Sequence, residues 1–248
     1  MADILIIFGS SSDSKVYDTI LENTENSEVI VCSAHRSPDV LSTILKKSDA
    51  KVLVAGAGLA AHLPGVMASQ TIKPVIGVPV NSNFQGLDAL LAIVQMPPGI
   101  PVLCVGVDNA EEAARYSKMM LKQYNGITIT GDIKNERVEK AVEILEKFEV
   151  PFEISDKISE KNVNLQFGNV AKPKGMTINI PLLDTSKVEN ALQLMHMMKR
   201  GIWVGVGRAE NAAIAAVEIL NFSGDYTKKL NEYREEMKQK IIDGLKTS

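Results

Sequence analysis

Residues 3–13, DILIIFGSSSD, join a short apolar run to a loop of glycine, serine and aspartate. An apolar run of this length, bounded by glycine and hydroxyl side chains, is typical of a buried strand rather than of a signal peptide or a membrane span. Serine and aspartate are favoured at helix N-termini, where they accept hydrogen bonds from free backbone N–H groups. The stretch therefore predicts a strand over 4–8 that leads through a polar loop into a helix.

The same alternation of short apolar runs and longer amphipathic runs continues to about residue 122. Further strands are predicted over 28–33, 50–56, 73–80 and 100–107, and helices over 13–26, 38–47, 60–70, 85–94 and 109–122. This alternation is typical of an α/β protein with a mainly parallel sheet covered on both faces. Ligands of such sheets bind outside the carboxyl ends of the strands, so we expect the functional residues in the loops that follow the strands.

The second half of the chain repeats the first. ITITGD at 127–132 resembles the opening strand and places Gly131 opposite Gly9, an offset of 122 residues. INIPL at 178–182 resembles IGVPV and places Pro181 opposite Pro79, an offset of 102 residues. Two such matches in the same order indicate a tandem repeat whose second copy is shortened.

The change in offset locates the shortening. Because 122 − 102 = 20, we expect a loss of about a helix and a strand between Ile154 and Thr177. The offset of 102 also places Asn211 opposite Asn109. We therefore expect one domain over 1–122 and a shortened repeat of it over 127–248, with C-terminal helices and a boundary near residues 123–126.

The second copy lacks the polar phrases that follow the strands of the first. GDIKN stands opposite GSSSD, SDKISE stands opposite SAHRSP, and nothing resembles GAGLAAH. If the first copy holds a working site, the second is a structural partner built on the same plan.

Composition excludes several classes of function. The net charge is −3 and the lysines are scattered, so a nucleic-acid partner is not expected. The two cysteines, Cys32 and Cys104, fit a reducing cytoplasm rather than a disulfide framework. No set of histidine, aspartate and glutamate residues at ligand spacing surrounds any of the three histidines, so we expect no metal site.

Each polar loop admits a functional and a structural interpretation. GSSSD at 9–13 could hold an anion at a helix N-terminus, or could only cap that helix. In SAHRSP at 33–38, His35 could transfer a proton near neutral pH and Arg36 could bind a phosphate, or the two could form a solvated surface pair.

The third and fourth loops are similarly ambiguous. AGAGLAAHLPG at 55–65 is rich in glycine and alanine, and the small size of these residues lets a ligand approach the backbone closely. Its histidine, His62, could contact that ligand or could hydrogen-bond a helix end. The loop at 79–88 could act as a lid or could be an ordinary connection. His196 lies among methionines in a predicted helix, which favours packing or a surface position.

Taken together, GSSSD, SAHRSP, AGAGLAAHLPG, GVPV and LAIVQMPPGIPV resemble the N5-carboxyaminoimidazole ribonucleotide mutases of purine biosynthesis and the related aminoimidazole ribonucleotide carboxylases, over about residues 3–114. The resemblance implies a flavodoxin-like three-layer fold and a symmetric oligomer with sites where subunits meet. It implies no metal or organic cofactor. The substrate would be a 5-phosphoribosyl aminoimidazole whose carboxylate leaves the exocyclic nitrogen as carbon dioxide and is re-attached to the ring carbon.

The resemblance also assigns roles residue by residue. The phosphate and ribose would be bound by Ser10, Ser12, Asp13 and Arg36. The aminoimidazole would face Ser33 and His35, and His35 would move the proton that leaves the ring carbon. The pocket for carbon dioxide and the carboxylate would be lined by Ala57, Gly58, His62 and Leu63.

Two alternatives to the mutase remain at this point. The chain could be a carboxylase that uses free carbon dioxide, although that type carries a lysine in place of Arg36, or it could be a ribonucleotide-binding module without catalysis. By analogy with an octamer of single-domain subunits, we expect a tetramer of two-domain chains. Leu59 stands where the family usually has a small residue, and we expect it not to touch the chemistry.

Overall fold

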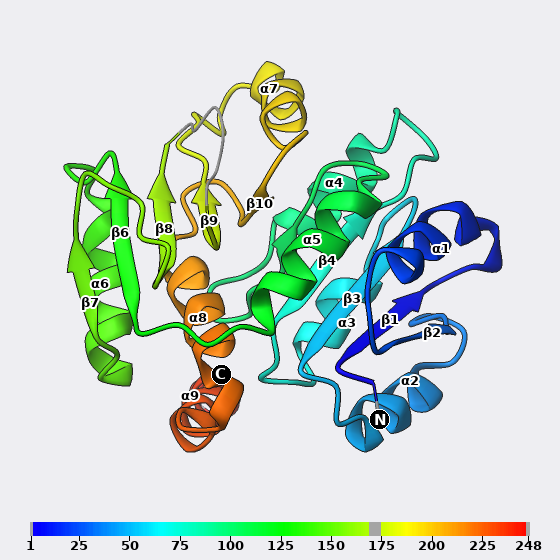
Figure 1. Cartoon of the computed structure of the whole chain (residues 1–248), viewed down its shortest axis with the longest axis horizontal. Helices are drawn as coiled ribbons and strands as arrows, with labels where there is room; N and C mark the ends of the chain where they lie inside the picture. The colour runs from blue at the N-terminus through cyan, green and yellow to red at the C-terminus, as the bar shows by residue number, and fades with distance from the viewer. Residues whose placement is uncertain (1, 169–174, 247–248) are drawn as a thin grey trace.

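A single ten-stranded sheet runs through the protein, in a computed structural model that describes residues 2–168 and 175–246 (Figure 1). The strand order is β2-β1-β3-β4-β5-β10-β9-β8-β6-β7. Neighbouring strands are parallel except β5 and β10, which pair antiparallel. The strands are β1 (Ile4–Phe8), β2 (Ser27–Val31), β3 (Val52–Ala57), β4 (Val75–Pro79), β5 (Leu103–Cys104), β6 (Ile127–Gly131), β7 (Phe152–Ile154), β8 (Val163–Phe167), β9 (Thr177–Ile180) and β10 (Ile202–Trp203).

Helices cover both faces of the sheet. One layer contains α1 (Ser14–Glu22), α5 (Ala110–Met120), α6 (Arg137–Phe148) and α8 (Ala209–Leu220), with the start of α9 (Thr227–Lys246) against it. The other contains α2 (Pro38–Lys47), α3 (Leu63–Ala68), α4 (Leu87–Val94) and α7 (Glu189–Met197). Short 3₁₀ turns, Ser11–Asp13 and Asn221–Ser223, precede α1 and follow α8. The predicted flavodoxin-like three-layer α/β fold is confirmed.

The apolar run that opens the chain is buried because both faces of β1 are covered. Ile4, Ile6 and Phe8 pack in the layer of α1 and α5, whereas Leu5 and Ile7 pack in the layer of α2 and α3. None of the five is more than 2% exposed. A strand buried on both faces needs a continuous apolar run rather than an alternating one, which is the pattern of this segment.

The two halves of the sheet have the same strand order. In the first half it is β2-β1-β3-β4-β5, and in the second the corresponding strands follow as β7-β6-β8-β9-β10. The halves meet where Cys104 of β5 pairs with Trp203 of β10. Beyond each of these strands one residue has left-handed backbone, Asp108 with φ 54° and Gly207 with φ 64°. Asp108 donates its N–H to Pro79 O at the end of β4, and Gly207 donates its N–H to Pro181 O, one residue beyond β9.

The match between Asp108 and Gly207 gives an offset of 99 residues, so the predicted pairing of Asn211 with Asn109 is wrong. Asn211 corresponds to Glu112 instead. The reason is local. Six residues lie between Gly99 and Gly106 in the first copy, whereas three lie between Gly201 and Gly205 in the second.

The predicted loss of a helix and a strand is also wrong, because every strand of the first half has a counterpart. The second half is shorter because two of the connections between its strands are shorter than those of the first half. The β2–β3 connection has 20 residues and contains α2, whereas the β7–β8 connection has 8 residues and no helix. The β3–β4 connection has 17 residues and contains α3, whereas 9 residues join β8 to β9, of which 169–174 lie outside the described residues. The two shortenings, of 12 and 8 residues, account for the whole change in offset.

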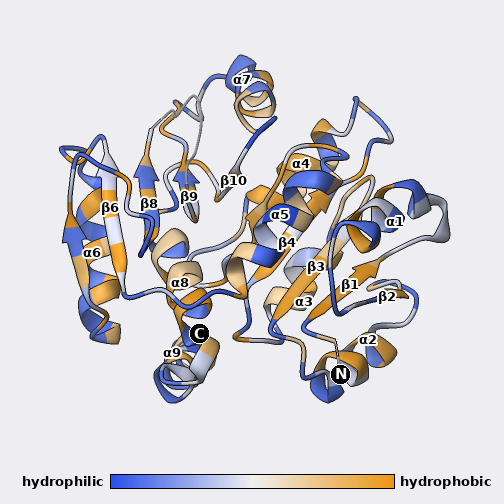
Figure 2. Ribbon diagram, in the orientation of Figure 1, coloured by the Kyte–Doolittle hydropathy of each residue, from blue (hydrophilic) through white to orange (hydrophobic). Residues whose placement is uncertain are grey.

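On the face that α2 and α3 cover in the first half, the second half carries polar side chains. Among them are Thr128, Asn164 and Asn179, all fully buried, and Figure 2 shows hydrophilic positions in β8 and β9 where β1 and β3 are hydrophobic. The amide of Asn164 accepts a hydrogen bond from Ser159 N and donates to Ser159 O and Met176 O. Polar side chains thus hold short loops where the first half has helices.

Candidate functional site

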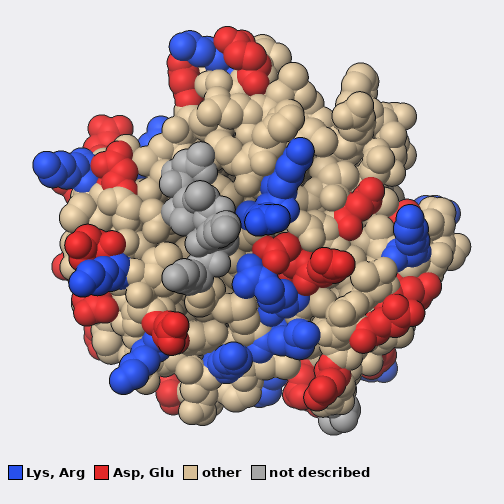
Figure 3. Space-filling model, turned by 45° about the horizontal axis from the view of Figure 1, so that its top comes forward, with Lys and Arg blue, Asp and Glu red and all other residues tan. Residues whose placement is uncertain are grey.

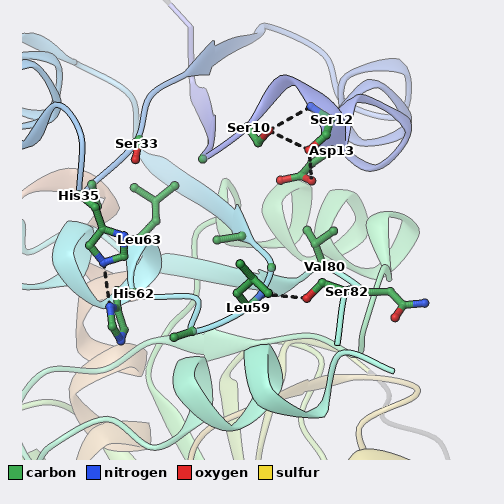
Figure 4. A pocket seen from close by; sticks show the side chains of 16 residues that line it. Ser10, Ser12, Asp13, Ser33, His35, Leu59, His62, Leu63, Val80 and Ser82 are labelled. Carbon is green, nitrogen blue, oxygen red and sulfur yellow. Dashed lines mark hydrogen bonds between the residues drawn. The ribbon is translucent and has the colours of Figure 1, made fainter. Parts of the chain in front are cut away.

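The loops after β1, β2, β3 and β4 enclose a cavity of about 710 Å³ at the carboxyl edge of the first half-sheet (Figure 4). Strand β1 lies between β2 and β3, so the chain reverses its direction across the sheet at this point, which is where open α/β sheets bind ligands. Nine of the ten predicted site residues line the cavity: Ser10, Ser12, Asp13, Ser33, His35, Ala57, Gly58, His62 and Leu63.

Arg36 is the predicted residue that does not line the cavity. Its Nη2 donates to Gly9 O at 3.3 Å, so the guanidinium lies against the loop that follows β1. The side chain is exposed. Arg36 therefore lies beside the serine loop, outside the residues that line the cavity.

The loop after β1 brings three polar side chains together. Ser10 precedes the 3₁₀ turn, and its Oγ accepts a hydrogen bond from Ser12 N at 3.2 Å. The hydroxyls of Ser10 and Ser12 lie 2.8 Å apart, and Ser12 Oγ donates to Asp13 Oδ1 at 3.1 Å. The capping interpretation therefore holds for Ser10. The same bonds also fix a cluster of hydroxyls at the cavity wall, ahead of helix α1.

Asp13 closes this cluster. Burial raises the pKa of its carboxyl, the hydrogen bond from Ser12 opposes that shift, and the nearby negative charge of Asp108 adds to it. Asp108 is itself tied to the cavity, because its Oδ1 accepts a hydrogen bond from Asn81 N at 2.9 Å. Asn81 lies in the cavity wall formed by the loop after β4.

The loop after β2 is folded back on itself before α2 begins. Ser37 N donates to Ser33 O at 3.0 Å, Arg36 N donates to Ser33 Oγ at 3.3 Å, and Pro38 occupies the first turn of the helix. Proline suits that position because it has no N–H to leave unpaired. The loop therefore presents His35 at the sheet edge, as the sequence predicts.

His35 meets His62 across the cavity floor. Its Nε2 lies 2.9 Å from His62 Nδ1, and the two rings stand nearly perpendicular, at 84°, with centroids 5.0 Å apart. One of these nitrogens must carry the proton of the hydrogen bond and the other must accept it. Both rings are exposed toward the cavity side, and Figure 4 shows them opposite the cluster of Ser10, Ser12 and Asp13.

Sequence reasoning missed two residues of the third and fourth loops. Leu59 lines the cavity, although sequence reasoning did not include it among the site residues. Ser82 lines it too, and its Oγ accepts a hydrogen bond from Leu59 N at 2.9 Å, so it couples the two loops. The polar composition of residues 79–88 was the available signal for Ser82, although it could not distinguish a wall from a lid.

The rest of the described chain and its surface add four observations. Acidic and basic side chains are interspersed on the face shown in Figure 3. Within residues 2–168 and 175–246, no three side chains of histidine, cysteine, aspartate or glutamate are grouped to hold a metal ion. No helix in that same part of the chain is long and apolar enough to cross a membrane. His196 is exposed on α7 and contacts Leu192 O, which confirms the surface interpretation.

These features define the class: a flavodoxin-like α/β protein whose ligand site, at the reversal of strand order, has hydroxyls on one wall and paired imidazoles on the other. Residues 3–130 match the family described as AIR carboxylase. The chain belongs to that family.

Several relatives are named as mutases. The N5-carboxyaminoimidazole ribonucleotide mutase of Methanocaldococcus jannaschii is 56% identical over 115 residues, which cover 45% of this chain and 73% of the relative. The mutase of Thermotoga maritima is 42% identical over 156 residues, 59% of this chain and 90% of the relative. A probable mutase of Methanobrevibacter smithii is 34% identical over 175 residues, 65% of this chain and 52% of the relative.

Proposed function

We propose that this protein is an N5-carboxyaminoimidazole ribonucleotide mutase of purine biosynthesis, an isomerase that converts its substrate to 4-carboxyaminoimidazole ribonucleotide. The names of relatives that are 42–56% identical support the activity. The observation that carries the assignment in this chain is the arrangement of the cavity, where paired imidazoles face a hydroxyl and carboxyl cluster across a space of about 710 Å³.

The polar wall suits the ribonucleotide end of the substrate. The clustered hydroxyls of Ser10 and Ser12 and the carboxyl of Asp13 can bond phosphate and ribose oxygens, with Arg36 beside their loop to bind the phosphate charge. Remote binding of this kind holds the reacting ring in place. The imidazole wall then faces the base, beside Ala57, Gly58 and Leu63.

The reaction needs a single proton to be moved. When the bond between the exocyclic nitrogen and the carboxylate breaks, its electron pair stays on nitrogen and carbon dioxide is released. The ring carbon then attacks carbon dioxide, and its proton leaves to restore the aromatic ring. We assign acceptance of that proton, and its return to nitrogen, to His35, with the hydrogen bond to His62 fixing the imidazole.

For assembly we propose that residues 127–248 are a shortened copy of the domain and occupy the position of a neighbouring subunit, in a tetramer of two-domain chains. Reciprocal contacts support this. Gly201 N donates to Glu112 Oε2 at 2.6 Å, and Gly99 N donates to Asn211 Oδ1 at 2.8 Å. Because Asn211 corresponds to Glu112, and Gly201 to Gly99, each half makes the same contact to the other, as in a two-fold interface.

A side-by-side assay tests the activity. The full-length protein is given either the N-carboxylated ribonucleotide or the uncarboxylated ribonucleotide with added bicarbonate. Fast conversion of the first and slow conversion of the second at low bicarbonate are expected of a mutase. Comparable conversion of the second would favour the carboxylase, and tight binding without conversion of either would favour a binding module.

A further inference from the structure

Leu59 is an unusual residue in the cavity wall. Its backbone is left-handed, with φ 55°, a conformation that glycine adopts freely and that leucine adopts only with strain. Its side chain is 56% exposed, so it does not fill the hydrophobic core. Folding alone therefore gives no reason for a leucine here, because glycine would suit the backbone better and would leave no core void.

The turn that carries Leu59 is firmly held. Leu59 N donates to Ser82 Oγ at 2.9 Å, and Leu59 O accepts from Ala61 N at 3.0 Å. The preceding Gly58 is packed tightly, since a Cβ there would lie 3.2 Å from Ser82 Oγ. With the backbone fixed on both sides, the direction in which the Leu59 Cα–Cβ bond leaves the turn is fixed too. In Figure 4 it lies between the histidine pair and Val80.

The intermediate of the proposed reaction explains what such a side chain does. Carbon dioxide is small and uncharged, so it offers no ion pair by which the site can hold it. It is kept only if the cavity gives it no path to solvent and no water. The cavity is open on the side of its exposed loops, and Leu59 supplies apolar bulk there, next to Gly58 of the carboxylate end.

We propose that Leu59 retains carbon dioxide between its release from nitrogen and its capture by the ring carbon. This inference rests on the proposed function and adds to it the residue that sets the balance between internal transfer and exchange with solution. Because the family usually has a small residue at this position, Leu59 is not what makes the site a mutase; in this account it strengthens the retention of carbon dioxide in a site that already transfers the carboxylate internally.

The test measures exchange directly. The enzyme, in excess over the N-carboxylated ribonucleotide, completes one turnover in ¹³C-bicarbonate with carbonic anhydrase present, and mass spectrometry gives the labelled share of the carboxylated product. Leu59→Gly is expected to raise that share at least about fivefold over wild type, whereas Leu59→Met, which keeps apolar bulk, should stay near wild type. Asn26→Gly is the control, because Asn26 is also left-handed (φ 49°) but lies outside the cavity.

Each outcome decides a separate point. An unchanged labelled share in Leu59→Gly, with product still formed, would overturn the role of Leu59 and leave the mutase assignment intact. The same increase in Asn26→Gly or in Leu59→Met would also overturn it, since relief of backbone strain or any change of shape would then suffice. No product in the wild type would refute the proposed function itself. Circular dichroism melts check that all variants are folded.

Discussion

The two halves of this protein build the same five-stranded order and differ in what connects the strands. In the first half, connections of 20 and 17 residues carry α2 and α3, and their first residues form the cavity. In the second half, the corresponding connections have 8 and 9 residues. The two half-sheets share one strand order although their connections differ, so that order depends on the strands and on the helices of the opposite layer, whereas the candidate site lies in the connections.

A single pair of corresponding residues shows the same difference at atomic scale. Asp108 and Gly207 have the same left-handed backbone, but Asp108 directs a carboxylate to Asn81 N in the cavity wall. Gly207 carries no side chain, and the guanidinium of Arg137 occupies the space that its Cβ would fill. In the first half, the side chain at this position, Asp108, bonds the wall of the candidate site. In the second half, the same space holds the guanidinium of Arg137, which comes from the second half itself.

The largest expected effect is on the reaction rate. It is expected when His35 of the first half is replaced, but not when His196 of the second half is replaced. His35→Asn should lower the rate of carboxylate transfer by about 10²–10⁴-fold, because an amide cannot take up the ring-carbon proton. His196→Asn, on the exposed face of α7, should leave the rate unchanged. Steady-state rates on the N-carboxylated ribonucleotide, with thermal melts of each variant, measure this.

A near-wild-type rate in His35→Asn would remove the assigned role of His35. An equal loss in His196→Asn would mean that the second half takes part in the chemistry, contrary to the proposal that it is a structural partner.

The sequence predicts the fold of the first half well because its signals are local. The continuous apolar run of β1, the glycine and serine that follow it, and the proline that begins α2 each act within a few residues. The cavity was predictable for a similar reason, since parallel strands bring their carboxyl ends to one edge. Within the second half, the strand order could be read from the repeat, but its missing parts could not.

The features of the site that the sequence did not predict depend on contacts between residues that are far apart in the chain. The bond between His35 and His62 joins residues 27 positions apart, and the bond between Ser82 and Leu59 joins residues 23 positions apart. The loss of helices rather than of a strand was hidden because an offset counts residues and not elements. Leu59 looked like a neutral departure, since its place in the cavity follows from its left-handed turn.

The next effect tests the reciprocal contacts between the halves. Asn211 is 2% exposed and serves Gly99 N and Pro97 O, so Asn211→Ala should reduce the free energy of unfolding by about 2–3 kcal/mol by leaving both groups unpaired. Glu112→Ala should cost less, about 1–2 kcal/mol, because the carboxylate that serves Gly201 N is only partly buried. Urea unfolding measures both.

Asn231→Ala, an exposed position on α9, is the control and should change stability by less than about 0.5 kcal/mol. A cost for Asn211→Ala no larger than that of the control would show that the contacts between the halves do not stabilise the chain.

The last expected effect is a dependence on pH and concerns Glu218, which stands where the first half has Met119. Burial raises the pKa of this carboxyl to about 8, and the charge and hydrogen bond of Arg234 oppose the shift. In the unfolded chain the ordinary value is 4.5. Between these values the folded state keeps a proton that the unfolded state releases. The contribution of Glu218 to stability is therefore full below about pH 4.5 and is lost as the pH rises from there through about 8.

Glu218→Gln removes the titrating group but keeps an oxygen for Arg234, so the decline attributable to Glu218 should vanish from its urea-unfolding curve between pH 5 and 8. The difference between wild type and variant at each pH isolates Glu218 from the other groups that titrate in this range. If the two curves stay parallel, Glu218 is ionised throughout and the ion pair with Arg234 outweighs its burial. If they converge as the pH falls, Glu218 is a buried carboxyl that stands where the first half has an apolar residue, at a cost in stability that depends on pH.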